Sequence, residues 1–127
     1  MPRFALLEHT GAPDDPTGRH FDLLVEAGGA CRTWRLFDVP RAGGPAVPAL
    51  ELPPHRLVWL DRVEGAVSGG RGFARRVDAG TFEPLALDAD SVSAATVLVL
   101  QLAGVRFGGR LRLESIADGR SAIVAAV

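Results

Sequence analysis

Residues 19–36 read RHFDLLVEAGGACRTWRL, and this stretch decides the fold class. From Arg19 to Glu26 apolar side chains alternate with more polar ones, and a period of two residues predicts a β-strand. The paired glycines Gly28 and Gly29 then predict a tight turn into a second strand over Cys31–Leu36, which makes a β-hairpin. One side of the first strand carries Phe21, Leu23 and Val25, and the other side carries His20, Asp22, Leu24 and Glu26.

The rest of the 127-residue chain repeats this pattern, because 15 glycines and 9 prolines separate short apolar runs. Turns are predicted at Asp78–Gly80 and Asp118–Arg120, and the proline-rich residues Val39–Pro54 are predicted to form a surface loop. Further strands are predicted over Phe4–His9, His55–Leu60, Arg71–Val77, Thr81–Leu85, Thr96–Leu102, Arg110–Ser115 and Ala122–Val127.

The predicted fold is therefore all-β, with little helix and one domain over residues 1–127. About eight short, mostly antiparallel strands would expose many unpaired edges in an open sheet, so we expect a small closed or crescent-shaped β-barrel. Cys31 is expected to be a buried structural thiol. The predicted core includes Phe21, Trp34, Phe73 and Phe107.

The amino-acid composition limits which kinds of partner we expect this protein to bind. The 14 basic residues, all of them arginine, nearly balance 15 acidic residues for a net charge of −1, so any contact with a polyanion has to be local. No apolar run approaches the ~20 residues that span a bilayer, and no membrane contact is expected. The lone Cys31 excludes an intramolecular disulfide and no signal-peptide pattern opens the chain, so we expect a cytoplasmic protein.

Two of the three histidines lie in adjacent predicted strands and suggest a metal site. His20 and Asp22 are two residues apart, so their side chains leave the same face of a strand ~7 Å apart, and His9 can supply a third ligand. Two imidazoles and one carboxylate leave coordination positions open, as in catalytic rather than structural metal sites. The spacing alone favours an ordinary solvent-facing side of a barrel strand, because a strand that reads H-x-D is common.

An ordered series of short motifs resembles one protein family. The segments LEH at residues 7–9 and RHFDLLVE at residues 19–26 are similar to K-H-D and L-H-Y-D-F-R-L-E in the phosphoesterase module of bacterial DNA ligase D. The order of the pieces is more specific than any one of them. The resemblance continues through RTW (32–34), PHRLVW (54–59, like D-H-P-L-D-Y), VEG (63–65, like F-E-G), residues 75–82, and LAGVRFGGRLRL (102–113).

The resemblance implies a curved β-barrel that holds one divalent ion, usually manganese, with zinc or magnesium as alternatives. It implies hydrolysis of phosphate esters at the 3′ end of DNA or RNA-tipped DNA, or of a small phosphoester, with a repair ligase or polymerase as partner. His9, His20 and Asp22 would be the metal ligands. His55 would contact the scissile phosphate, and Trp59 stands where the family has a tyrosine with that role.

Three departures from the family pattern bear on activity. Leu24 replaces an arginine, the loop Thr10–Gly18 is longer and carries Asp14 and Asp15, and Phe4 already begins the first strand, so the polar N-terminal arm of the module is expected to be missing. Two alternatives therefore stay open: a catalytically impaired module that binds metal or phosphate, and a barrel that only scaffolds a repair complex. The cations that could replace the lost arginine are Arg19, Arg71, Arg75 and Arg76, each of which also fits a solvated surface position.

Overall fold

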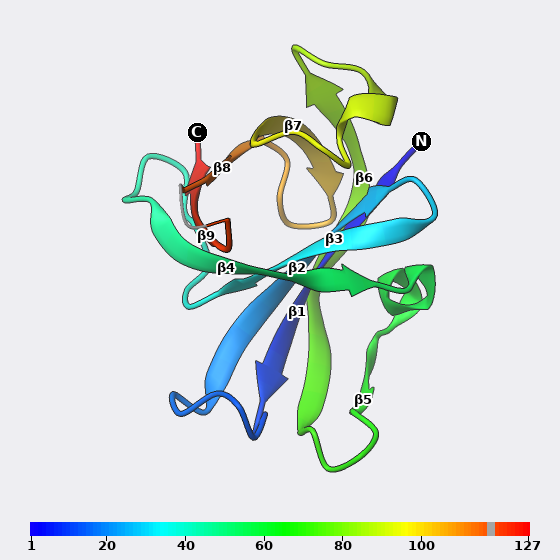
Figure 1. The fold of residues 1–127 in the computed structure, drawn as a ribbon, viewed down its shortest axis with the longest axis vertical. Helices are drawn as coiled ribbons and strands as arrows, with labels where there is room; N and C mark the ends of the chain where they lie inside the picture. The colour runs from blue at the N-terminus through cyan, green and yellow to red at the C-terminus, as the bar shows by residue number, and fades with distance from the viewer. Residues whose placement is uncertain (117–118) are drawn as a thin grey trace.

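An antiparallel sheet closes on itself to form the protein, which was studied as a computed structural model that describes residues 1–116 and 119–127. Within the described residues, eight strands form a closed barrel and β5 lies outside it, which confirms the predicted fold class (Figure 1). The strands are β1 (Arg3–Thr10), β2 (Arg19–Ala27), β3 (Ala30–Leu36), β4 (Val47–His55), β5 (Glu64–Ala66), β6 (Phe73–Leu85), β7 (Val97–Gly104), β8 (Arg110–Ser115) and β9 (Ser121–Ala126).

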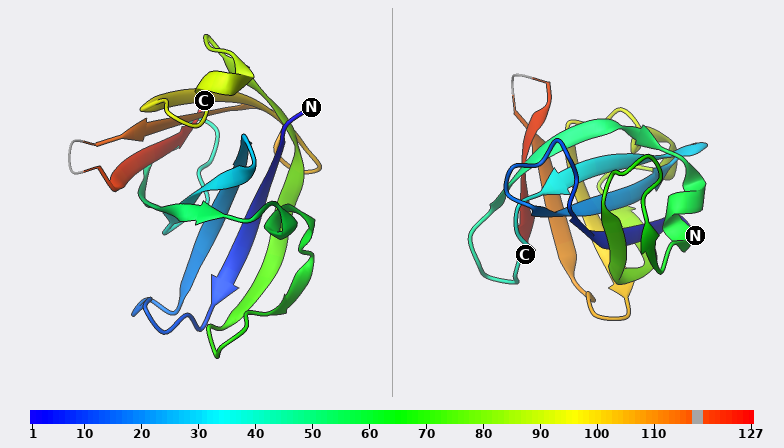
Figure 2. Two further views of the ribbon diagram at one scale, coloured as in Figure 1. Left: turned by 45° about the vertical axis from the view of Figure 1, so that its right-hand side comes forward. Right: turned by 90° about the horizontal axis from the view of Figure 1, so that it is seen from below.

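The strand order around the barrel is β1-β2-β3-β4-β9-β8-β7-β6, and pairing of β6 with β1 closes it. Viewed from below, the strands form a ring (Figure 2). The ends of β1, β2 and β6 nearest the β1–β2 loop project together on the side of the molecule away from β7 (Figure 1). This projection carries the candidate site.

The hairpin predicted from residues 19–36 is confirmed. Ala27 pairs with Ala30 across the two glycines. Gly28 has φ +67°, a left-handed backbone conformation that this two-residue turn requires and that glycine adopts without strain. The pairing continues in register from this turn to Phe21 opposite Leu36. A two-residue turn thus sets which side chains of β2 and β3 lie next to each other.

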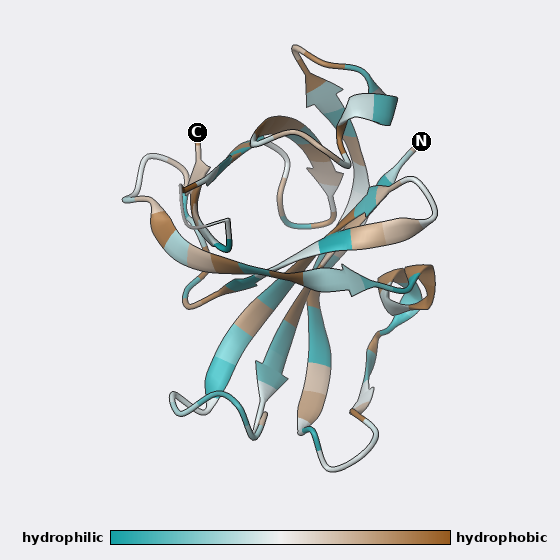
Figure 3. Cartoon of the chain, in the orientation of Figure 1, coloured by the Kyte–Doolittle hydropathy of each residue, from teal (hydrophilic) through white to brown (hydrophobic). Residues whose placement is uncertain are grey.

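Both faces of β1 and β2 are buried, whereas the sequence pattern predicts a polar second face for β2. The inner face packs Phe4, Leu6, Leu23 and Val25 into the barrel core with Trp34. The outer face carries a second apolar cluster, Ala5, Leu7, Leu24, Cys31 and Leu60. Leu60 belongs to the 3₁₀ helix η1 (Leu57–Asp61), which packs against this face of the sheet. Hydrophilic residues gather at the end of β1 and the start of β2, beyond this cluster (Figure 3).

The predicted turn at Asp78–Gly80 is wrong, because β6 runs unbroken through it from Phe73 to Leu85. The carboxylate of Asp78 is buried and accepts hydrogen bonds from the backbone N–H groups of residues 105–107, so it closes the β7–β8 loop rather than a turn of its own. Gly80 lies against the backbone of Ala103 and Gly104 so closely that a Cβ there would overlap them. The glycine serves close strand packing, not chain reversal.

The predictions for residues 39–60 are also wrong in part. The predicted loop Val39–Pro54 contains all of the strand β4 except its last residue, His55. Pro48 lies opposite Ile123 of β9 but beyond the pairing with β3, which begins at Ala49. Pro53 and Pro54 lie at a shift in the β3–β4 register, where the ladder is irregular. The predicted strand His55–Leu60 is largely η1, since a short apolar run does not distinguish helix from strand.

Three smaller outcomes complete the comparison. Trp34 and Phe21 are core residues as predicted and Phe107 packs partly buried against the core, but Phe73, the first residue of β6, is 42% exposed. Asp118, which begins the last predicted turn, lies outside the described residues. In the part of the chain that the structure describes, no helix is long and apolar enough to cross a bilayer.

Candidate metal centre

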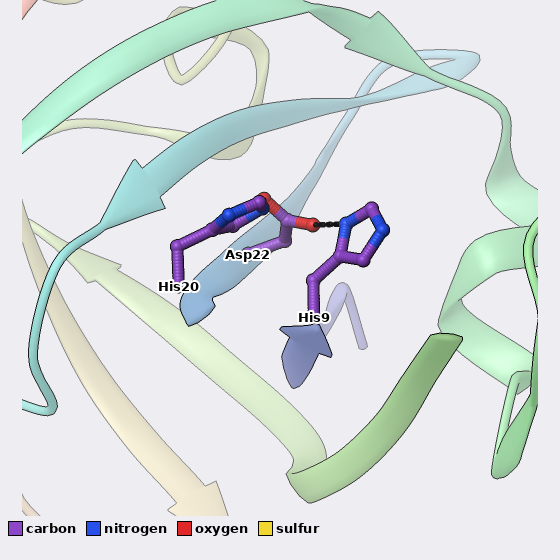
Figure 4. A group of neighbouring side chains, drawn as sticks. All are labelled: His9, His20 and Asp22. Carbon is purple, nitrogen blue, oxygen red and sulfur yellow. Dashed lines mark hydrogen bonds and ion pairs between the residues drawn. The ribbon is translucent and has the colours of Figure 1, made fainter. Parts of the chain in front are cut away.

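His9, His20 and Asp22 converge on one face of the β1–β2 pair. His9 lies directly opposite His20 in the strand register, and Asp22 follows two residues later on the same face. The two imidazole rings have centroids 4.8 Å apart, and one ligand atom from each of the three residues lies within 4.8 Å of the others. The Asp22 carboxylate lies between the two rings (Figure 4).

Asp15 holds the His20 ring from behind. The Nδ1–H of His20 donates to the Asp15 carboxylate at 2.7 Å, and both side chains are almost completely buried. The backbone N–H and hydroxyl of Thr17 donate to the other Asp15 oxygen at 2.9 and 2.6 Å. With the proton on Nδ1, the lone pair of His20 Nε2 faces Asp22, the arrangement by which carboxylates orient metal-binding histidines.

His9 is held in the complementary way by a backbone carbonyl. Its Nε2–H donates to the carbonyl oxygen of Arg71 at 2.6 Å, and its Nδ1 lies 3.3 Å from Asp22 Oδ2. Gly72 makes this contact possible, since its φ of +92° and its missing Cβ let the turn pass directly over the backbone of Thr10 and Gly11. The inward-facing nitrogen of His9 is thereby also left with its lone pair toward Asp22.

The buried polar atoms of the cluster fit a bound cation. Among the described residues, His20 Nε2 and Asp22 Oδ1 are buried without a hydrogen-bond partner, although they lie only 3.3 Å apart. Two lone pairs and a carboxylate that face one point repel one another unless a positive charge lies between them. Two imidazoles and one carboxylate are donors typical of a divalent transition-metal ion, with positions left for water or substrate.

A proton is the other cation that the cluster attracts, and the pKa values reflect this. The hydrogen bond to Asp22 raises the pKa of His9 above its usual 6.5. Burial alone would raise the pKa of Asp22, but the nearby rings of His20 and His9, each 3.3 Å from its carboxylate, outweigh burial and hold that pKa at about 2. Hydrogen bonds from Thr17 and His20 likewise lower the pKa of Asp15 to about 2, so both carboxyls stay ionised.

A pocket of about 340 Å³ opens beside the cluster. His9 and Asp22 line it, and so do the sequence-predicted His55 and Trp59. The Nδ1–H of His55 donates to the Pro53 carbonyl at 3.0 Å, which leaves its Nε2 available, and the ring meets Trp59 edge-on at 6.0 Å between centroids. The size lies within the usual range of small-ligand sites. The remaining lining residues are Leu7, Ala12, Pro13, Asp14, Leu24, Arg35, Leu52, Val67, Arg71 and Ala74.

The arginines divide between the two faces of the sheet. Of the four predicted phosphate contacts, Arg71 lines the pocket, with its guanidinium donating to Ser68. Arg19 and Arg75 both pair with Glu8, which points to the opposite face from His9. Arg76 donates to the backbone carbonyl of Leu60, which belongs to η1.

Two residues of the site were not predicted from the sequence. Asp15 was expected only as extra negative charge in a long loop, yet it is the partner of His20. Arg35 was not predicted, yet it lies directly opposite Asp22 in the β2–β3 register and lines the pocket. The signal for Arg35 was present, because a two-residue turn between Ala27 and Ala30 pairs residue 22 with residue 35.

Comparison with protein-family models and with curated protein sequences does not identify a family for this chain. The chain matches no protein-family model and no curated protein sequence. Any functional conclusion therefore depends on the geometry of the site and on the motif resemblance.

Proposed function

We propose that this protein is a divalent-metal-dependent phosphoesterase similar to the DNA ligase D module. It would hydrolyse a phosphate ester at the 3′ end of DNA or RNA-tipped DNA, or a small phosphoester, in DNA repair. One observation carries the proposal: both histidines have their outer N–H groups fixed by acceptors, so that the inner nitrogens face the Asp22 carboxylate. Such tautomer control is typical of metal ligands and is not needed on a solvated strand face.

His9, His20 and Asp22 would hold the ion, with manganese the first choice and zinc or magnesium as alternatives. When bound, a divalent ion supplies Lewis-acid chemistry that polarises a phosphoryl oxygen and lowers the pKa of a water. The residues Asp15, Thr17 and the Arg71 carbonyl keep the ligands in place.

His55 would act on the phosphate itself. Its Nδ1–H is engaged by the Pro53 carbonyl, so Nε2 is the atom that faces the pocket; when this nitrogen also carries a proton, it would donate to a phosphoryl oxygen or pass that proton to the leaving oxygen. Trp59 lies against the same ring and would restrict how it turns. The apolar side chains of Leu7 and Leu24 in the pocket wall limit water around the reacting group.

The test is release of inorganic phosphate from a 3′-phosphorylated DNA primer, with and without Mn²⁺, together with calorimetric titration of Mn²⁺. Wild-type protein should bind one Mn²⁺ and show Mn²⁺-dependent release. His20→Ala should lose both properties, whereas the matched variant His55→Ala should keep Mn²⁺ binding and lose release. Phosphate release without metal, or equal Mn²⁺ binding by wild type and His20→Ala, contradicts the proposal.

A second candidate is a non-catalytic module that retains the metal and phosphate pocket. Leu24 favours it, since this buried pocket residue stands where the family has an arginine, and a missing charge-stabilising donor costs about 3 kcal/mol in comparable sites. In that case wild-type protein binds Mn²⁺ but releases no phosphate. A scaffold role differs from both, because His9→Ala and His20→Ala would then leave metal uptake and partner binding unchanged.

A further inference from the structure

Arg35 is a largely buried cation that the rest of the protein leaves incompletely bonded. Its side chain is 12% exposed and points to the metal face of the sheet, directly opposite Asp22 in the strand register. Its Nη2 reaches the Asp14 carboxylate at 3.2 and 3.3 Å. Within the described chain, its Nε is buried without a hydrogen-bond partner and its Nη1 makes no hydrogen bond.

Arg32 on the same strand is fully bonded and shows what Arg35 lacks, whereas Arg76 on β6 shares a buried Nε without a partner among the described residues. Arg32, buried to a similar degree, donates from all three nitrogens to Glu51 and to the carbonyls of Val92 and Ala95. A buried guanidinium with unmet donors is costly unless a further acceptor arrives. Arg35 therefore has the capacity to bind an anion in the pocket that it shares with His9 and Asp22.

Asp14 is a weak partner that an anion can displace. Its side chain is 73% exposed, and both contacts to Arg35 are long for a charge-assisted hydrogen bond. Because the Asp14 side of the pair is exposed, solvent and salt screen it, and it contributes little to stability. Asp14 also lines the pocket, so an anion bound there competes with it for the same guanidinium.

We propose that Arg35 is the anion-binding residue of this site, that Asp14 occupies it in the free protein, and that the ligand it favours is a terminal phosphomonoester dianion. The proposal rests on the proposed function for the presence of the ion. Once Asp14 is displaced, a divalent cation, the carboxylates of Asp22 and Asp15 and the guanidinium groups of Arg35 and Arg71 sum to two positive charges, which a dianionic monoester neutralises and a singly charged diester does not. Arginine also matches two phosphoryl oxygens at once through its planar fork.

The test is calorimetric binding of inorganic phosphate to the Mn²⁺-loaded protein, with Mn²⁺ alone titrated first. Arg35→Met should weaken phosphate binding at least about tenfold while leaving Mn²⁺ binding unchanged. Asp14→Asn should tighten phosphate binding about two- to fivefold by removing the competitor. A purely structural ion pair would weaken phosphate binding when either partner is removed, whereas a competing ion pair gives opposite changes in the two variants. Arg35→Lys should bind phosphate more tightly than Arg35→Met, because lysine keeps the positive charge. Arg75→Met, on the other face of the sheet, is the matched control and should bind phosphate like wild type.

The outcomes divide cleanly. Equal phosphate affinity in wild type and Arg35→Met, no gain in Asp14→Asn, or no phosphate binding by the Mn²⁺-loaded wild type overturns the role of Arg35. If the wild type takes up no Mn²⁺, the proposed function fails, and the same variants titrated with phosphate alone still decide the role of Arg35. If phosphate binds as proposed but a 3′-phosphorylated primer is not hydrolysed, the anion site holds and the phosphoesterase proposal fails.

Discussion

Asp15 and His20 form a fully enclosed hydrogen-bonded pair, with 2.7 Å between the carboxylate and Nδ1 and almost no solvent contact on either side chain. A carboxylate behind an imidazole raises its basicity and fixes its orientation. The pair lies at the end of the long β1–β2 loop and directs His20 Nε2 toward Asp22. The loop thus supports the cluster instead of simply adding negative charge beside it.

Asp15→Asn should lower Mn²⁺ affinity about 10- to 100-fold without removing any ligand. The amide can still accept from His20, but it no longer provides the negative charge that favours the bound cation. Calorimetric titration of Mn²⁺ measures the change. The neighbouring Asp14→Asn is the control, since Asp14 contacts Arg35 and neither histidine, and its Mn²⁺ affinity should equal that of wild type. If Asp15→Asn binds Mn²⁺ as tightly as Asp14→Asn does, Asp15 does not act through His20.

Gly72→Ala should destabilise the protein by about 3 kcal/mol and weaken metal binding. A Cβ at this position would overlap the backbone of Thr10 and Gly11, and the residue has φ +92°, which side chains rarely adopt. Relief of the overlap moves the Arg71 carbonyl away from His9 Nε2. Urea unfolding measures the stability and calorimetry the affinity for Mn²⁺.

Gly70→Ala is the matched control for the Gly72 variant. Gly70 has a similar left-handed φ of +69° but open space around its Cβ position, so its substitution should cost about 1 kcal/mol and leave Mn²⁺ binding unchanged. If the two variants behave alike, the close approach of the turn to β1 has no role in the site.

The metal-free protein should be most stable between about pH 4 and 6.5. The pKa values of Asp15 and Asp22 are held at about 2, so the stability that these carboxylates contribute is present above their unfolded value of 3.8 and is lost as the pH falls toward 2. The pKa of His9 is raised above 6.5, so its contribution is present below that value and is lost as the pH rises through the raised pKa.

Urea unfolding of the metal-free protein from pH 2 to pH 9 measures this dependence. His9→Asn should remove the loss of stability on the alkaline side and leave the acid side in place. Mn²⁺ competes with the proton on His9, so its affinity should rise over the same alkaline range. A stability that stays constant between pH 6 and pH 9 in the wild type would show that His9 does not pair with Asp22 in solution.

Much of the fold was predictable because local signals and tertiary structure agree. The Gly28–Gly29 turn and the alternation in β2 specify the hairpin, and the hairpin register then brings Arg35 beside Asp22. The grouping of His9 with His20 was predictable from adjacent strands. Asp15 was not, since a loop residue five positions from its partner leaves no periodic signal.

The errors arose where a polar or turn-forming residue serves a distant segment. Asp78 and Gly80 resemble a turn along the chain, but their partners are residues 103–107 of the β7–β8 region. Pro53 and Pro54 of β4 avoid the regular ladder by a register shift that only the pairing with β3 reveals. Local propensity is overridden in both places by contacts far apart in sequence.

Asp78→Ala should destabilise the protein by about 3–5 kcal/mol, more than any exposed aspartate. The carboxylate is 2% exposed and accepts backbone N–H bonds from Ala79, Val105, Arg106 and Phe107 at 2.7–3.1 Å. Its removal leaves these donors unpaired, and the cost of unmet buried donors exceeds the value of the bonds themselves. The β7–β8 loop should then lose its fixed position beside β6, which faster amide exchange at residues 105–107 would reveal.

Asp88→Ala is the control for Asp78→Ala. Asp88 is exposed and accepts only from Ser91 among the described residues, so its loss should cost about 1 kcal/mol when both variants are unfolded in urea. Similar costs for the two variants would show that Asp78 is replaced by water and does not hold the loop.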